Sequence, residues 1–349
     1  NSWSSGPSLT VPRQHPMAWT AHGKIYVAGG RTSNWTYYDS IEVFDPATNQ
    51  WSLVGNMPEK KSMSGHVVVN GIVYLVAGSK GDYNHSNKVF AADVTPPMDL
   101  YFRDANATGT ITLDKLAGAV VSKLDGNASA LPPIGAVSTV DHNAQPPAEH
   151  TVLERTDRNA THAWEEMASA SVKRFAIDGV EEMGGNIYFV GGRNSDSGTS
   201  YNIAERYDPA LNQWQSLPSM STARAYVATS SLNGKLYAIG GSGQSSMEVF
   251  DPISNQWSAG PALPNELTGA AATSFNGKIF LSGGQNGSGQ NLNQVLQFDP
   301  STNQWSQKAA MPTPRRFHQL VVFESKIWAI GGDASDGALD SVEIYDPIA

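Results

Sequence analysis

The sequence predicts an all-β fold in which six four-stranded sheets close into a ring, a β-propeller. Three observations predict it. The phrase Asp-Pro-Ala-Thr-Asn-Gln-Trp, Asp45 to Trp51, recurs with the same internal spacing at Asp208, Asp251 and Asp299. An apolar run ending in Gly-Gly precedes each copy, and a turn containing Pro follows it. A repeat of this length indicates an array of similar units rather than several unrelated domains.

The first repeat shows how each unit folds. Residues 17–20 are apolar, a tight turn follows, and residues 24–30 form a β-branched and aromatic run that ends in Gly-Gly. Residues 40–44 alternate between apolar and polar side chains, and Trp51 begins one more extended run. These are the signals of strands joined by short turns. Each repeat is therefore expected to form four antiparallel strands, which is one blade.

Gly-Gly pairs, or a close match to one, indicate six blades. Blade 2 has Ala77-Gly78 in place of the pair. The last blade lacks its Trp because the sequence ends at Ala349, but reading on from Ala349 into Asn1-Ser2-Trp3 restores the repeated phrase. We therefore expect the N-terminal strand to complete the last blade and close the ring. The other pairs are Gly29-Gly30, Gly191-Gly192, Gly240-Gly241, Gly283-Gly284 and Gly331-Gly332.

This pattern of Gly-Gly, an aromatic residue before Asp-Pro, and Trp six residues after the Asp resembles the kelch repeat. The resemblance covers nearly all of the chain outside about residues 101–161, and it suggests a kelch protein of bacterial or secreted type. It implies a propeller whose face loops recognise partners. It also implies that enzymes built on kelch propellers have to be considered.

The step from Trp51 to Trp164 is much longer than the other Trp-to-Trp steps, which predicts an insertion in blade 2. We expect blades 1 and 2 in residues 1–100, with the closing strand of blade 6 inside residues 1–15. The insertion is expected in residues 101–161, and blades 3 to 6 in residues 162–349.

Two parts of the insertion have distinct patterns. Apolar residues at helical spacing predict a short helix at about residues 113–124. Residues 126–150 are rich in Pro, Gly and Ala and indicate an extended arm. A segment of this size is not needed to close a ring. It is therefore a second candidate surface for interaction, assembly or self-association.

A candidate calcium loop lies at the start of the insertion, with oxygen ligands expected from Asp104, Asn106, Thr108 and Thr110. Their spacing resembles a degenerate EF-hand or dockerin loop. Lys115 stands where that family places a bidentate acidic ligand. The alternative is an Asx-rich turn that caps the helix. Calcium is the one cofactor that the sequence suggests.

A second candidate site is a rim of cations, because five of the six repeats have Lys or Arg at nearly the same distance before Gly-Gly. Two positions after three of these cations lie aromatic rings. Basic side chains bind carboxylates and aromatic rings stack on sugars, so the set is predicted to bind a ligand. Alternatively, each cation bonds to loop carbonyls of its own repeat. The predicted rim consists of Arg13, His15, Lys61, Arg174, Arg224, Tyr226, Arg315 and Phe317.

Enzymatic chemistry is an alternative. Copper radical oxidases on kelch propellers need a Tyr cross-linked to a Cys, and this chain has no Cys. Sialic-acid epimerases are kelch propellers that use acid/base and Arg residues over the channel. Glu181, Glu182, Arg174 and Arg193 could serve such roles in an isomerase or lyase that acts on an acidic sugar. Blade 3 has one extra residue here, which predicts a bulge that turns one carboxylate toward the channel. No residue is assigned as catalytic.

Composition limits the class of partner. With 32 acidic and 23 basic residues the net charge is -9, which disfavours a nucleic acid partner. No apolar run approaches the roughly 20 residues of a transmembrane helix. Charged residues make up 16% of the chain, while Ser, Thr, Asn and Gly are abundant, which favours an extracellular or cell-surface location. The sequence therefore predicts a non-catalytic propeller that binds a protein or glycan, as an adhesion module does.

Overall fold

The computed structural model describes residues 2–81, 85–94, 164–176, 179–194 and 197–348. They belong to one compact unit, which comprises residues 1–95 and 164–349. The second unit, residues 96–163, lies outside the described residues. It contains the predicted helix, the Pro-rich arm and the candidate calcium ligands Asp104, Asn106, Thr108 and Thr110. These predictions therefore remain untested.

The described residues form six four-stranded antiparallel sheets, the blades of a β-propeller, and no helix. Blade 1 contains β2 (Met17–Ala21), β3 (Lys24–Ala28), β4 (Ser40–Asp45) and β5 (Gln50–Asn56). Blade 2 contains β6 (Gly65–Val69), β7 (Ile72–Ser79), β8 (His85–Asp93) and β9 (Glu165–Met167). Blade 3 contains β10 (Val180–Met183), β11 (Asn186–Val190), β12 (Ala204–Asp208) and β13 (Gln213–Leu217).

The later blades follow the same order from the innermost to the outermost strand. Blade 4 contains β14 (Ala228–Leu232), β15 (Lys235–Ile239), β16 (Met247–Asp251) and β17 (Gln256–Gly260). Blade 5 contains β18 (Ala271–Phe275), β19 (Lys278–Ser282), β20 (Val295–Asp299) and β21 (Gln304–Lys308). Blade 6 contains β22 (Gln319–Phe323), β23 (Lys326–Ile330), β26 (Val342–Asp346) and β1 (Ser2–Ser5). A two-stranded ribbon, β24 (Asp333–Ala334) and β25 (Gly337–Ala338), lies between β23 and β26 in the chain.

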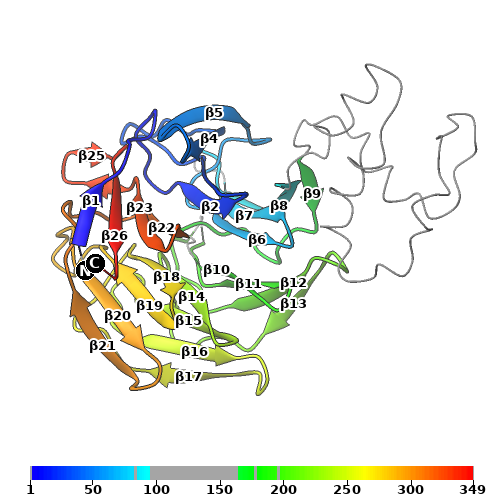
Figure 1. The fold of residues 1–349 in the computed structure, drawn as a ribbon. Helices are drawn as coiled ribbons and strands as arrows, with labels where there is room; N and C mark the ends of the chain where they lie inside the picture. Colours follow the sequence, from blue (N-terminus) through cyan, green and yellow to red (C-terminus); the bar gives the residue numbers. More distant parts are fainter. Residues whose placement is uncertain (1, 82–84, 95–163, 177–178, 195–196, 349) are drawn as a thin grey trace, which may run out of the picture. The chain divides into compact units, whose positions relative to one another are not determined.

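The innermost strands β2, β6, β10, β14, β18 and β22 contact one another in that order, and β22 contacts β2 again (Figure 1). The ring is therefore closed. The N-terminal strand β1 completes the last blade, as predicted, because Trp3 pairs with Tyr345 across β1 and β26. Their rings lie 5.1 Å apart, and Nε1 of Trp3 donates to the carbonyl of Ala309 at 2.8 Å. Strand β26 therefore has a partner on both sides.

The repeated Trp residues pack where neighbouring blades meet, and the interface of blades 1 and 6 shows how. Trp51 lies 5.4 Å from Phe44 in its own blade, and Phe44 lies 5.1 Å from Trp328 of blade 6. Nε1 of Trp51 donates to the carbonyl of Pro7 at 2.9 Å. The indole of Trp51 therefore buries its apolar surface, and its one polar group has a hydrogen-bond partner.

The Gly-Gly pairs allow neighbouring blades to approach through their backbones. Gly30 donates its N–H to the carbonyl of Lys61 in the next blade at 2.8 Å. Gly29 has φ +61°, and a Cβ atom on it would lie 2.4 Å from the Lys61 carbonyl oxygen. A side chain at Gly29 would therefore displace the next blade.

Candidate functional site

The candidate site lies on the loop face, which we define as the side of the ring that carries two kinds of segment. One kind links the second and third strands of a blade, as residues 29–39 do. The other joins successive blades, as residues 57–64 do. The predicted rim residues lie in the segments that join blades.

The five predicted rim cations lie inside the protein and not on its surface. Arg13, Lys61, Arg174, Arg224 and Arg315 are each 0% exposed. Each donates a hydrogen bond to the carbonyl of the first residue of the Gly-Gly or Ala-Gly pair in its own repeat. The prediction of an exposed cationic rim is therefore corrected. The alternative, in which each cation bonds within its own repeat, describes the geometry.

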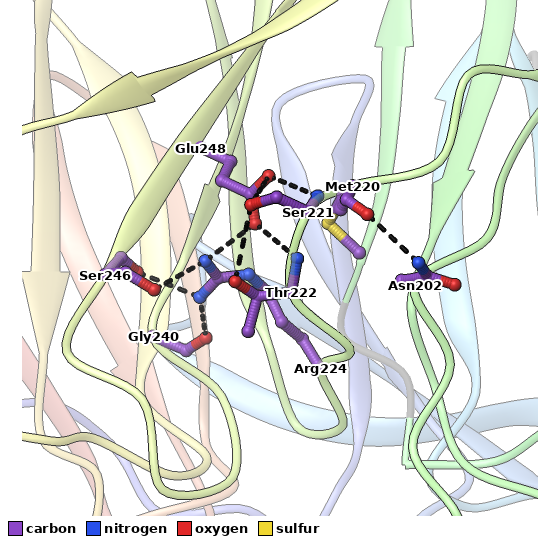
Figure 2. A network of polar contacts seen from close by, with 8 residues as sticks. All are labelled: Asn202, Met220, Ser221, Thr222, Arg224, Gly240, Ser246 and Glu248. Atoms are coloured by element: carbon purple, nitrogen blue, oxygen red, sulfur yellow. Dashed lines mark hydrogen bonds and ion pairs between the residues drawn. The ribbon is translucent and has the colours of Figure 1, made fainter.

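Arg224 shows how such a cation is held (Figure 2). It donates to the carbonyls of Gly240 and Ser246 at 2.6 and 2.9 Å, and it pairs with Glu248 at 3.0 Å. Glu248 in turn accepts a hydrogen bond from the backbone N–H of Ser221 at 2.7 Å. The ion pair therefore ties the segment that joins two blades to the third strand of blade 4. The equivalent pairs are Arg13 with Glu42, Arg174 with Glu205, and Arg315 with Glu343.

Blade 2 holds its cation differently. Phe90 replaces the Glu, and Nζ of Lys61 lies 5.1 Å from the centre of its ring. The same nitrogen lies 3.1 Å from Glu59 and donates to the carbonyl of Ala77 at 2.8 Å. Burial lowers the pKa of Lys61 to about 8, although Glu59 acts against this change. This lysine is a structural group, because none of it reaches solvent.

The three aromatic members of the predicted rim do come together. The rings of His15 and Phe317 stack at 3.9 Å, and Tyr226 lies 5.0 Å from Phe317 and 5.9 Å from His15. They come from the segments before blades 1, 4 and 6, and the closed ring of blades brings these segments together. His15 and Phe317 are buried and Tyr226 is partly buried. The three rings thus form an aromatic plug beneath the centre of the loop face.

Backbone hydrogen bonds hold this plug in place. His15 donates its N–H to the carbonyl of Phe317, Phe317 to Gly269, Gly269 to Tyr226, and Tyr226 to Ala176, over 2.8 to 3.2 Å. These five residues occupy the same position in five blades, and all have φ between +48° and +67°. The chain of bonds links blades 3, 4, 5, 6 and 1 around the mouth of the channel.

His15 is a buried polar group without hydrogen bonds. It is 2% exposed, and neither ring nitrogen has a hydrogen-bond partner among the described residues. Burial, together with the charges of Arg31 and Arg316, holds the pKa of His15 well below its ordinary value. The ring is therefore neutral at pH 7, so one nitrogen is a donor and the other an acceptor.

Arg31 lies above the plug at the first position after Gly-Gly in blade 1. Its guanidinium lies 3.8 Å from the centre of the Trp35 ring, and Trp35 is 62% exposed. Nε of Arg31 is buried and makes no hydrogen bond within the described structure. Burial lowers the pKa of Arg31, and Tyr37, Tyr226 and Asp333 act in the opposite direction. Arg31 thus combines a buried unpaired donor with an exposed aromatic neighbour.

A polar recess borders the same region. A cavity of about 830 Å³ lies between loops of blades 5, 6 and 1, with Arg316 and Asp333 in its wall. Arg316 pairs with Asp333 at 3.0 Å, and Gln14 donates to the other Asp333 oxygen at 2.8 Å. The charge of Asp333 is therefore closer to Arg316, with which it pairs, than to Arg31. The remaining wall is formed mainly by Ser33, Gln285, Gln290, Asn291, Thr313 and Ser335.

The residues considered for catalysis make their contacts with different neighbours. Arg174 pairs with Glu205, Arg193 donates to the carbonyl of Gly198, and Glu182 accepts from the N–H of Gly185. Glu181 lines the channel and accepts hydrogen bonds from blade 4. In the described part of the chain, no group of three His, Asp or Glu side chains is arranged to hold a metal ion. The described residues contain no helix that is long and apolar enough to cross a membrane.

Comparisons with known proteins agree with this architecture. A model of the KLHDC2/KLHL20/DRC7 kelch-repeats domain matches residues 179–349, and a kelch motif matches residues 20–58. The chain is built of kelch repeats. Kelch-like protein 23 of Mus musculus is 26% identical over 225 residues, which cover 64% of this kelch chain and 36% of that protein.

Two other relatives match shorter parts. The F-box/kelch-repeat protein At4g39580 of Arabidopsis thaliana is 38% identical over 82 residues, 24% of this chain and 20% of that protein. Alpha-scruin of Limulus polyphemus is 30% identical over 99 residues, 26% of this chain and 11% of that protein. The kelch chain therefore spans about a third or less of the length of these relatives.

Sequence reasoning missed Arg31, Trp35 and Arg316. The first position after the Gly-Gly or Ala-Gly pair holds four types of residue in the six blades, so it does not stand out as a repeated feature. The variation at this position among the blades could have indicated a binding site, because the fold does not require one residue type there. The six residues are Arg31, Ser79, Arg193, Ser242, Gln285 and Asp333.

Proposed function

We propose that this kelch propeller is a non-catalytic module that binds a protein partner through the centre of its loop face. The kelch repeats support this proposal, because proteins built of such repeats are typically protein-binding modules. The partner would present a carboxylate to Arg31 and an apolar or aromatic group to Trp35. The observation that carries the proposal is the guanidinium of Arg31, which lies 3.8 Å from the exposed Trp35 ring and has no carboxylate at ion-pair distance among the described residues.

The physical argument rests on hydrogen bonding and charge. Arg31 is 7% exposed, so a partner carboxylate would meet its guanidinium at the accessible edge beside Trp35. Charge-assisted bonds from guanidinium to carboxylate are among the strongest in proteins. Trp and Arg are also the residue types that most often dominate binding energy at interfaces. The recess lined by Arg316 and polar side chains gives room for further partner residues.

A panned library of random peptides on the whole protein tests this. Selected peptides are expected to be enriched in Asp or Glu, and Arg31→Ala should weaken them by at least about tenfold, since charged hydrogen bonds contribute about 1.5 to 3 kcal/mol. Arg206→Ala is the matched control, because Arg206 lies on β12 and bonds to Gln215. Equal binding to the Arg31→Ala variant would contradict the proposal.

A glycan ligand is the alternative within this proposal. The abundance of Ser, Thr and Asn supports an extracellular or cell-surface location, in which both partner classes occur. A glycan array decides between them: saturable binding of a sugar without peptide selection would favour the glycan. The insertion, residues 101–161, is proposed as an additional interaction or assembly surface. Its removal should leave peptide binding at Arg31 unchanged.

A further inference from the structure

The channel of the propeller contains a cavity of about 340 Å³ that belongs neither to the loop face nor to the aromatic plug. Residues from all six innermost strands line it. The plug residues His15, Tyr226 and Phe317 come just before β2, β14 and β22, so they cover the end of the channel at the loop face. The cavity therefore extends toward the opposite face. Its volume lies within the range of small-molecule sites.

Glu181 is the one carboxylate among the described residues that line this cavity, and none of those residues is Lys or Arg. Its two oxygens accept hydrogen bonds from Oγ1 of Thr229 and from the N–H of Ser231, both at 3.1 Å. Both donors are neutral. A partly buried carboxylate without an opposite charge nearby is costly, because neutral donors replace only part of its hydration.

The other titratable groups in the cavity wall do not supply that charge. Burial lowers the pKa of His66 to about 4, and Nε2 of His66 lies 2.7 Å from the carbonyl oxygen of Ala18. Burial and the nearby Arg315 hold the pKa of His318 well below its ordinary value, and Nε2 of His318 lies 2.8 Å from Oγ of Ser282. Both imidazoles are therefore neutral at pH 7.

The carboxylate is also peculiar to blade 3. The hairpin register aligns Glu181 with Trp19, Val67, Ser230, Thr273 and Val321 in the other five blades, and none of these is charged. The propeller thus folds without a carboxylate at this position. A structural requirement of the repeat does not explain it.

We propose that the channel binds a small organic cation, an alkylammonium group, with the Glu181 carboxylate as its counter-ion. The hydroxyls of Thr229, Ser230 and Thr273 in the cavity wall supply further acceptors for the N–H groups. Val67, Val180 and Val321 supply apolar surface for the alkyl part. The site is separate from the proposed protein-binding surface, so either proposal can fail without the other.

The proposal implies a dependence on pH. Burial and the neighbouring Glu182 raise the pKa of Glu181 to about 7, while its bonds to Thr229 and Ser231 act against this change. A bound cation favours the ionised carboxylate. Binding should therefore strengthen as the pH rises from 6 to 8, while His66 stays neutral over this range.

Titration of the whole protein with n-butylammonium chloride, followed by the NMR signals of the Val67 and Val180 methyl groups, tests the proposal. We expect saturable shifts at millimolar concentration. Glu181→Gln should weaken binding by at least about tenfold, as expected for loss of a charged partner. Glu266→Gln is the matched control, because Glu266 is exposed, is not in the cavity wall and does not act on Glu181.

Four outcomes would overturn the proposal. They are the absence of saturable shifts, equal binding to the Glu181→Gln variant, equal shifts with neutral butan-1-ol, and equal shifts with potassium chloride. If Glu181→Gln does not fold, the wild-type protein still gives a decision. Binding that does not strengthen between pH 6 and 8 would then exclude Glu181 as the counter-ion.

Discussion

Leu267 and Leu296 occupy in blade 5 the two positions that Arg224 and Glu248 occupy in blade 4. The carbonyl of Leu267 accepts the N–H of Gly241, as that of Arg224 accepts the N–H of Gly192. Leu296 of β20 pairs with Leu281 of β19. In the same way, Glu248 of β16 pairs with Ala238 of β15. Both leucines are buried in one apolar cluster. The buried ion pair and the apolar pair are therefore two solutions to the same packing problem.

This relationship predicts strong coupling between Arg224 and Glu248. Each single substitution, Arg224→Leu or Glu248→Leu, leaves an uncompensated buried charge and should lower the free energy of unfolding by about 3 to 5 kcal/mol. The double variant should lose less than the sum, with a coupling of about 1 to 3 kcal/mol. Urea denaturation measures all four proteins.

The control for this cycle is the exposed pair of Lys88 and Glu166, which lie 2.7 Å apart. Their side chains are 41% and 48% exposed, so the coupling there should be about 0 to 1 kcal/mol. Additive effects at Arg224 and Glu248 would show that the two residues stabilise the blade independently.

Lys61 should make stability depend on alkaline pH. Its pKa is about 8 in the folded protein, below the ordinary value, so the unfolded chain binds more protons between pH 8 and 10.5. The free energy of unfolding should therefore rise over this range because of Lys61. Lys61→Met should reduce that rise, as measured by urea denaturation at several pH values. Lys60→Met, an exposed neighbour, is the control, and a rise of the same size in both variants would contradict the prediction.

Glu181 should make the free energy of unfolding depend on pH in the acidic range. Its pKa is raised to about 7 in the folded protein, so the folded state binds more protons than the unfolded state between pH 4.5 and 7. Its contribution to stability is present below this range and decreases as the pH rises through it. Glu181→Gln should remove that decrease. Thermal unfolding from pH 4.5 to 7.5 measures it, and an identical pH profile for the Gln variant would be inconsistent with a raised pKa of Glu181.

Trp3 and Trp35 should separate stability from binding. Trp3 closes blade 6 and is partly buried, so Trp3→Ala should lower the free energy of unfolding by about 2 kcal/mol. Trp35 is 62% exposed, so Trp35→Ala should change it by less than about 0.5 kcal/mol. Trp35→Ala should nevertheless weaken the selected acidic peptides. Loss of stability in Trp35→Ala, or unchanged peptide binding, would place Trp35 outside the proposed site.

The fold could be predicted because its repeated residues meet local backbone requirements. Gly29 and its equivalents avoid the carbonyl of the next blade, and Asp45 accepts the N–H of Ala47 within its own turn at 2.9 Å. Such requirements recur in each blade and therefore appear in the sequence as a period. Closure of the ring by Trp3 could also be predicted, because the Asp-Pro to Trp repeat continues from the last residue of the sequence to the first.

The direction of the rim cations could not be predicted in the same way. Arg13 and its equivalents lie in segments without a regular period, so spacing identifies them as a set but does not distinguish inside from outside. Their acidic partners are distant in the chain and stand three residues before each Asp-Pro, as Glu42 does before Asp45. Blade 5 lacks both the cation and the Glu, which suggests that they pair, although blade 2 keeps Lys61 with Phe90 in place of the Glu.

The backbone bonds at the mouth of the channel divide the work between the main chain and the side chains. Because main-chain atoms join Ala176, Tyr226, Gly269, Phe317 and His15, no side chain at these positions is required to hold the blades together. Yet four of the five have side chains in a left-handed conformation that glycine would adopt at lower cost. Three of these side chains instead pack against one another in the aromatic plug. The main chain thus holds the blades together here, and the side chains close the channel.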